Sequence, residues 1–247
     1  MFLSLLLDFQ WMHLLQPQWY IEHGGLWLLL FVVFAETGLF VGFFLPGDSL
    51  LFVAGIYTHE FRADHGGSVP GLGFQFLKYF GLDNNHSPLL DLFVLTALIS
   101  FCGIMGNMVG FWTGKRFGPA MYQWKDRWLF KKRFLTEAHE FYEKHGVLAI
   151  VVARFVPFIR TFAPIVAGVV KMDRKKFYFY NVIGCVAWVI LMLFSGFYLQ
   201  QWILAQFNFD LKQHLEVIVI GIVLVTTAPI LYKLLFGKRK PKTNAVP

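Results

Sequence analysis

The sequence predicts an all-α integral membrane protein with three full transmembrane helices, two oppositely oriented re-entrant helical hairpins that form an inverted repeat, and an N-terminal interfacial amphipathic helix. Hydrophobic residues make up 57% of the chain and charged residues 15%, a balance that a soluble domain of this size does not need. Two apolar runs contain prolines and ionisable residues and are too short to cross a bilayer twice. Basic residues cluster beside the apolar runs, and they assign each loop to one side of the membrane. We therefore treat residues 1–247 as a single membrane domain.

The N-terminal segment, residues 1–23, mixes leucine and phenylalanine with polar side chains and is interrupted by Pro17. It is too short and too polar to span a bilayer, so we expect an amphipathic helix that lies at the interface. Its first 20 residues contain no lysine or arginine, so the basic region of a cleavable signal peptide is missing.

The first broken run, residues 26–57, is apolar except for Glu36 and Asp48 and carries Pro46-Gly47 in its middle. One crossing needs about 20 residues, so this run falls short of two crossings. We predict a re-entrant hairpin that breaks at Pro46 and Gly47. The sequence Pro46-Gly47-Asp48-Ser49 also predicts the start of a half-helix with Asp48 as its N-cap.

Residues 58–90 are polar and rich in glycine, and we expect them to form a periplasmic loop before a transmembrane helix at 92–114. Gly106, Gly110 and Gly114 recur on one face of that helix and indicate close helix packing. The contact could lie within or between subunits, so a homo-oligomer stays open.

The second broken run, residues 147–170, lies between basic clusters in 115–146 and 171–176. The positive-inside rule places both clusters in the cytoplasm, so the run begins and ends on the same side. We predict a second re-entrant hairpin that breaks near Pro157 and Pro164.

The remaining segments are two further transmembrane helices, at 177–200 and 215–236, and a basic cytoplasmic tail at 237–247. The two hairpins each end in Ala-Gly, at Gly55 and Gly168. Two broken segments in corresponding positions are typical of an inverted-repeat transporter with a binding site at the bilayer midplane. The proline and glycine positions expected to shape the hairpin breaks are Pro46, Gly47, Gly55, Pro157, Pro164 and Gly168.

Four ionisable residues fall inside the two hairpins: Glu36 and Asp48 in the first, Arg154 and Arg160 in the second. Ionisable residues at membrane depth are functional by default, and pairing across the repeat interface would neutralise these four. There are simpler interpretations: Glu36 only satisfies an arginine, Asp48 only caps a helix, and Arg154 snorkels to the interface. Arg160 lies too far from either end of its run to snorkel easily.

The residue types indicate an anion site. Guanidinium groups near half-helix N-termini suit phosphate, so we assign substrate phosphate binding to Arg154 and Arg160. Glu36 and Asp48 are assigned to charge pairing and proton coupling. The formal net charge of +7 sits beside apolar runs, so the expected partners are anionic lipids and protons rather than nucleic acid. We expect no metal and no cofactor.

Three stretches resemble the bacterial DedA family: residues 34–42, 44–51 and 154–168, which together contain all four charged residues. The resemblance implies a multi-pass inner-membrane protein with two re-entrant hairpins, related to the VTT, or SNARE-associated, lipid scramblases of eukaryotes. It also implies that Glu36, Asp48, Arg154 and Arg160 are needed for function. Members of the family are implicated in returning undecaprenyl phosphate across the membrane, in phosphatidylethanolamine movement, and in proton-dependent drug and pH tolerance.

The function expected from these observations is a proton- or potential-coupled flippase for undecaprenyl phosphate, and the C-terminus should be cytoplasmic. The alternatives are a phosphatidylethanolamine flippase or scramblase and a proton-coupled exporter of cations or drugs. An enzyme such as a lipid phosphatase is not expected, because all eight histidines lie outside the apolar cores and no nucleophile with an acid–base partner stands out. A purely structural role leaves four costly charges unexplained.

Overall fold

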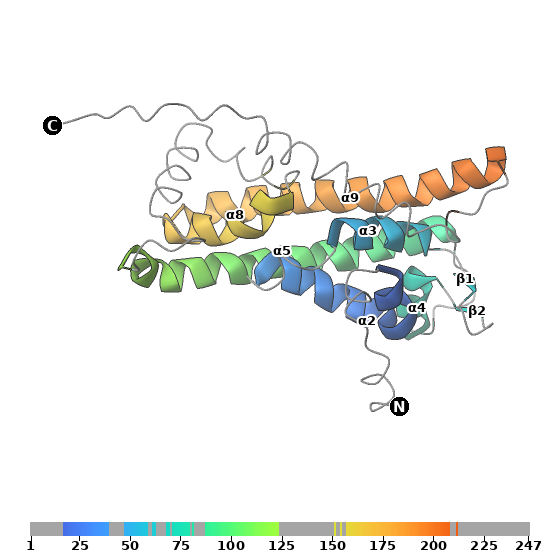
Figure 1. The fold of residues 1–247 in the computed structure, drawn as a ribbon, viewed down its shortest axis with the longest axis horizontal. Helices are drawn as coiled ribbons and strands as arrows, with labels where there is room; N and C mark the ends of the chain where they lie inside the picture. The colour runs from blue at the N-terminus through green and yellow to red at the C-terminus, as the bar shows by residue number, and fades with distance from the viewer. Residues whose placement is uncertain are drawn as a thin grey trace, which may run out of the picture.

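The described part of the chain is almost entirely helical in the computed structural model (Figure 1). The residues that the structure describes are 17–39, 47–58, 61–62, 68–69, 71–79, 81, 87–123, 151, 154, 157–207 and 211. The helices are α2 (Pro17–Gly38), α3 (Gly47–Ile56), α4 (Leu72–Tyr79), α5 (Pro88–Gln123), α8 (Pro157–Val169) and α9 (Arg174–Phe207). A short antiparallel ladder pairs β1 (Phe61–Arg62) with β2 (Ser68–Val69).

Two long helices, α5 and α9, carry apolar stretches long enough to span a membrane, Pro88–Gly118 and Arg174–Phe207. They include the predicted spans at 92–114 and 177–200. The helices are longer than these predictions, because a helix can continue past the hydrocarbon where water satisfies its polar side chains. The predicted span at 215–236 and the tail at 237–247 lie outside the described residues, so the count of three spans stays a prediction.

The predicted loop at 58–90 is wrong in part, because it contains helix, and helix also extends into the basic segment at 115–146. The segment 58–90 holds the strand pair, α4 and the first turn of α5, and the start of the 115–146 segment is the last part of α5. In α4, Leu72 and Leu77 are buried while Tyr79 is exposed, so this helix forms by packing one apolar side against the protein.

The N-terminal helix α2 bends at Gly25, whose φ of 53° lies in the left-handed region that favours glycine. Beyond the bend, the backbone amide of Leu26 donates to Gln75 Oε1 of α4 at 3.2 Å. The boundary expected between residues 23 and 26 is therefore a kink within one helix. Residues 1–16 lie outside the described part of the chain, and the interfacial placement of the N-terminus stays a prediction.

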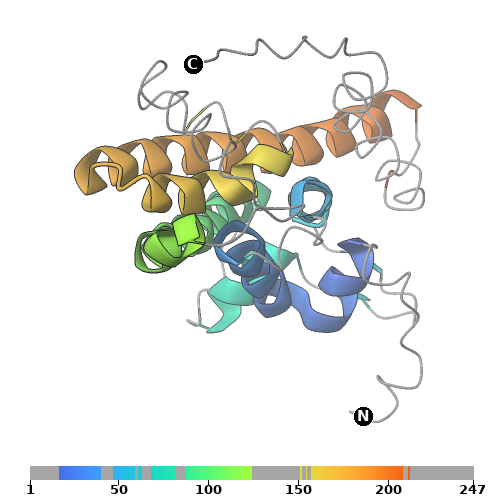
Figure 2. The same ribbon diagram turned by 60° about the vertical axis from the view of Figure 1, so that its left-hand side comes forward.

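The short helices α3 and α8 lie against the long pair, α3 on α9 and α8 on α5 (Figure 1). Figure 2 views α3 nearly end-on, between α9 and α2. At 1.5 Å per residue, the 10 residues of α3 extend about 15 Å, roughly half of a 30 Å hydrocarbon core. This length is the one that the hairpin prediction requires of a half-helix.

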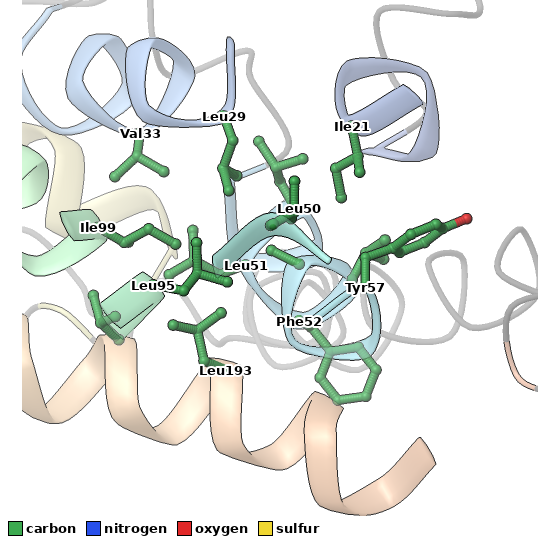
Figure 3. Packing of buried hydrophobic residues seen from close by; sticks show 14 of the residues in the cluster. Ile21, Leu29, Val33, Leu50, Leu51, Phe52, Tyr57, Leu95, Ile99 and Leu193 are labelled. Atoms are coloured by element: carbon green, nitrogen blue, oxygen red, sulfur yellow. The ribbon is translucent and has the colours of Figure 1, made fainter. Parts of the chain in front are cut away.

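The main apolar core is built where α2, α3, α5 and α9 meet (Figure 3). Buried side chains that converge there include Leu29, Val33, Leu50, Leu51, Leu95, Ile99 and Leu193. A smaller cluster joins α5, α8 and α9, where the stacked rings of Phe111 and Phe177 have centroids 4.3 Å apart. The core therefore fixes the half-helices to the two long helices.

Reciprocal glycines set the crossing of α3 and α9. A Cβ at Gly55 would lie 2.2 Å from the carbonyl oxygen of Leu193, and a Cβ at Gly196 would lie 2.1 Å from that of Phe52. Leu193 lies three residues before Gly196, and Phe52 lies three residues before Gly55, so the two contacts are symmetric. No side chain fits at either position without separating the helices.

The crossing of α8 and α5 repeats this pattern. A Cβ at Gly168 would lie 2.1 Å from the carbonyl oxygen of Phe111, and a Cβ at Gly114 would lie 2.0 Å from that of Ile165. The predicted packing role of the α5 glycine face is confirmed. An inverted repeat would produce this same pair of glycine contacts twice, once between α3 and α9 and once between α8 and α5. In such a repeat, α4 and the strand pair would be an insertion in the first half.

Three of the predicted hairpin breaks are wrong, because Gly55, Pro164 and Gly168 lie inside helices. The two glycines are close-contact positions, and Pro164 removes only one helical hydrogen bond and packs against the open side of Gly110. Gly47 and Pro157 do begin α3 and α8, as a break before each half-helix requires. Pro46 lies outside the described residues.

Candidate functional site

The centre of the site is Arg160, which bridges Glu36 and Asp48, the two acids of the predicted first hairpin. One guanidinium nitrogen donates to Glu36 Oε1 and the other terminal nitrogen donates to Asp48 Oδ1. The three residues lie on α8, α2 and α3, and partners more than 100 positions apart in sequence meet here. Glu36 is 2% exposed and Arg160 8% exposed, so this is a buried ion-pair triad.

Local structure explains why these three side chains meet. Glu36 lies near the end of α2, Asp48 lies in the first turn of α3, and Arg160 lies in the first turn of α8. A Cβ at Gly47 would lie 1.3 Å from Glu36 Oε2, so α3 can begin directly on the Glu36 carboxylate only because residue 47 has no side chain.

Charge and helix polarity differ between the two half-helices. A helix N-terminus carries partial positive charge, which favours Asp48 at the start of α3 and disfavours Arg160 at the start of α8. Arg160 therefore needs carboxylates from outside its own helix, and Glu36 and Asp48 provide them. Asp48 was expected as an N-cap; it instead lies one residue inside α3, and its carboxylate faces Arg160.

A tryptophan that the sequence did not single out completes the triad. Trp188 of α9 is 1% exposed, and its ring centroid lies 4.7 Å from the Arg160 guanidinium carbon. Its indole Nε1 donates to Asp48 Oδ1 at 2.9 Å. One side chain thus supplies a cation–π contact to the base and a hydrogen bond to the acid.

Arg154 occupies a different environment. It is 6% exposed, and its terminal nitrogen donates to Asn181 Oδ1. No carboxylate among the described residues lies within salt-bridge distance of it. The snorkelling interpretation is therefore wrong for Arg154, and so is the expectation that all four charges pair. Both arginines remain close enough to interact electrostatically.

One face of α9 receives both arginines. Asn181, Gly184, Cys185 and Trp188 follow the i, i+3, i+4, i+7 spacing of a single helix face. A Cβ at Gly184 would lie 2.9 Å from Arg154 Cδ, so the glycine leaves room for that side chain. The spacing of these residues in an apolar span could have indicated that this face of α9 belongs to the site. It was not predicted from the sequence, because none of the four residues is charged.

Comparison with known proteins identifies the family. The VTT domain matches residues 71–198. Over 218 residues the chain is 34% identical to the protein DedA of Escherichia coli, a match that covers 87% of this chain and 85% of the relative. The chain belongs to the DedA family.

Other DedA-family relatives are named as membrane proteins. The chain is 27% identical over 177 residues to the inner membrane protein YqjA of Escherichia coli, covering 71% of this chain and 68% of the relative. It is 32% identical over 203 residues to an uncharacterized membrane protein of Mycobacterium tuberculosis, covering 82% and 75%. No solved structure matches the chain.

The site contains two kinds of buried charge, an ion-pair triad and a separate arginine. The triad of Glu36, Asp48 and Arg160 carries one net negative charge when both acids are ionised. Arg154 carries one positive charge beside neutral groups. Among the described residues, no cluster of histidine, cysteine, aspartate and glutamate could hold a metal ion. The side chains present are of types that can form ion pairs, exchange protons and bind anions.

Proposed function

We propose that this protein is a flippase that returns undecaprenyl phosphate, a polyprenyl monophosphate lipid carrier, across the bacterial inner membrane. The observation that carries the proposal is a pair of buried arginines, Arg160 in the first turn of α8 and Arg154 just before it: two acids pair with Arg160, and no carboxylate among the described residues pairs with Arg154. A buried charge is costly unless it is paired. An unpaired guanidinium in an apolar helical protein favours an anionic ligand.

In the proposed arrangement α2 with α3 forms one re-entrant hairpin, and the segment that contains Arg154 forms the other with α8. The substrate phosphate reaches the site between them, and the polyprenyl chain stays in the lipid. Glu36 and Asp48 change their charge state as the substrate moves, which would couple transport to protons or to membrane potential. The C-terminus faces the cytoplasm, and anionic lipids bind the basic segments.

A second candidate is a proton-coupled exporter of cations or drugs. It is favoured by one observation, the excess of carboxylate over guanidinium in the triad, which would suit a cationic substrate once Arg160 moved away. Arg154 argues against this candidate, because a cation entering the same region would be repelled. A phosphatidylethanolamine flippase would share the phosphate chemistry and differ in its headgroup amine.

The deciding experiment uses the purified full chain in proteoliposomes that contain one labelled substrate at a time. The substrates are a polyprenyl monophosphate, phosphatidylethanolamine and a cationic dye. We expect movement of the polyprenyl monophosphate above the protein-free background, and loss of this movement in Glu36→Gln, which removes one acid of the triad. Movement of the dye alone would replace the proposal with the exporter, and movement of phosphatidylethanolamine alone would replace it with a phospholipid flippase.

A further inference from the structure

We infer that the two arginines have different tasks, and that the phosphate group of the substrate binds to Arg154 and Asn181 while Arg160 holds the helices together. The inference rests on the proposed function and divides its site in two. The Arg154 subsite consists of Arg154, Asn181 and Cys185. The buried triad consists of Glu36, Asp48 and Arg160.

Arg160 offers an anion less than Arg154 does, because two carboxylates already balance its charge, although its buried Nε, like that of Arg154, has no hydrogen-bond partner among the described residues. Both of its terminal nitrogens already donate to carboxylates, and the Trp188 ring covers its guanidinium with a centroid distance of 4.7 Å. A phosphate that approached it would meet the negative charges of Glu36 and Asp48 at close range, where a low dielectric makes repulsion strong. In this arrangement Arg160 is a positioning residue.

Arg154 is buried, and the described side chain that it donates to is neutral. Among the described residues its side chain donates to the amide oxygen of Asn181, and its Nε has no hydrogen-bond partner there. An arginine that only held helices together would be better compensated by a carboxylate, as Arg160 is. No carboxylate in the described part of the chain balances this positive charge, which leaves it for a ligand.

The neighbouring groups of the Arg154 subsite supply further donors. The Asn181 amide nitrogen lies 3.4 Å from the carbonyl oxygen of Ile104, a long bond that a phosphate oxygen could replace. On the next turn, the Cys185 sulfur contacts the backbone carbonyl of Ser100 at 3.7 Å. The Ser100 hydroxyl is buried and makes no hydrogen bond within the described structure. Guanidinium, amide and hydroxyl donors together suit a phosphate monoester.

The test is the isosteric substitution Asn181→Asp, which gives Arg154 a carboxylate in the place of its amide. The unliganded protein should unfold at the same or a higher temperature, because a buried charge gains a partner. Asn107→Asp is the matched control: Asn107 is a buried asparagine of α5 whose amide donates to the Gly103 carbonyl at 2.6 Å. That variant should unfold at a lower temperature, because it buries a carboxylate and loses the amide donor to the Gly103 carbonyl.

Ligand binding is measured by thermal stabilisation of the detergent-solubilised protein, with farnesyl phosphate, farnesol and inorganic phosphate as probes. Farnesyl phosphate should stabilise the wild type, and Asn181→Asp should bind it at least about tenfold more weakly, the factor that corresponds to one charge-assisted hydrogen bond. Stabilisation by farnesyl phosphate but not by inorganic phosphate assigns the subsite to a lipid headgroup; stabilisation by both keeps the subsite and assigns it to a free phosphate as well. Equal stabilisation by farnesol overturns the inference.

A second variant keeps the inference testable if Asn181→Asp does not fold. Arg154→Lys keeps the charge but loses the planar two-nitrogen fork, so it should also bind farnesyl phosphate about tenfold more weakly. Unchanged affinity in either variant overturns the inference. If the wild type moves polyprenyl phosphate and Asn181→Asp moves it equally well, only this inference fails. If farnesyl phosphate binding depends on Asn181 but no lipid moves, only the proposed function fails.

Discussion

Replacing Arg160 by glutamine should lower the free energy of unfolding by about 3–5 kcal/mol, the usual cost of removing one partner from a buried ion pair. The structure argues for the upper part of that range, because the substitution strands two carboxylates, Glu36 and Asp48, rather than one. It also removes the cation that faces the Trp188 ring, a contact worth about 0.5–2 kcal/mol.

A rescue experiment separates the stranded charge from the lost side chain. Adding Glu36→Gln and Asp48→Asn to the Arg160→Gln variant removes both unpaired carboxylates, so the triple variant should be more stable than the single one. Stability is measured by reversible unfolding in mixed detergent micelles, followed by tryptophan fluorescence. A single variant within about 1 kcal/mol of the wild type would refute the buried triad, and so would a triple variant no more stable than the single one.

Two further substitutions test neighbouring parts of the structure. Trp188→Phe keeps a ring against the guanidinium but loses the hydrogen bond to Asp48. It should lower the free energy of unfolding by about 1.5–3 kcal/mol in the same assay. An unchanged unfolding midpoint would mean that the indole does not bind this carboxylate. Gly114→Ala places a Cβ 2.0 Å from the Ile165 carbonyl oxygen and should lower the free energy of unfolding by about 1–3 kcal/mol. Gly110→Ala on the same helix places its Cβ 3.4 Å from the nearest atom and should leave the stability nearly unchanged. Equal effects of the two alanines would contradict the close crossing of α5 and α8.

The charged part of the site could be predicted from the sequence because ionisable residues in an apolar run have few alternative roles. Glu36, Asp48 and Arg160 were singled out in this way, and the structure brings them into direct contact. The half-helix starts could also be predicted, because Gly47 and Pro157 carry the backbone preferences of such positions.

The neutral part of the site could not be predicted, since it depends on which face of α9 meets the arginines. Asn181 and Trp188 are ordinary residues in a transmembrane sequence, and only the packing of α9 against α3 and α5 gives them their partners. The prediction that all four charged residues pair with one another was wrong because it, too, depends on how the helices pack. The sequence contains two acids and two bases, but the direction of each side chain sends both acids to Arg160 and leaves Arg154 with an amide.

The Pro164 error has a different cause. A proline in an apolar run predicts a break, yet a single missing hydrogen bond is tolerated where the neighbouring helix offers a glycine against which the ring can pack. The sequence pattern indicates where a helix tends to break, and the packing against the facing helix determines whether it does. The lengths of α5 and α9 beyond their apolar stretches follow the same logic, because helix ends depend on what surrounds them.

The most direct test of the central claim is the rate at which proteoliposomes move a polyprenyl monophosphate when they contain the wild type or Arg154→Gln at equal amounts of folded protein. Glutamine keeps a polar side chain of similar reach but removes the positive charge that no described carboxylate balances. We predict that the wild type moves the lipid and that the variant falls to the protein-free background. Equal rates for the two proteins would contradict the claim that a buried, uncompensated arginine holds the lipid phosphate.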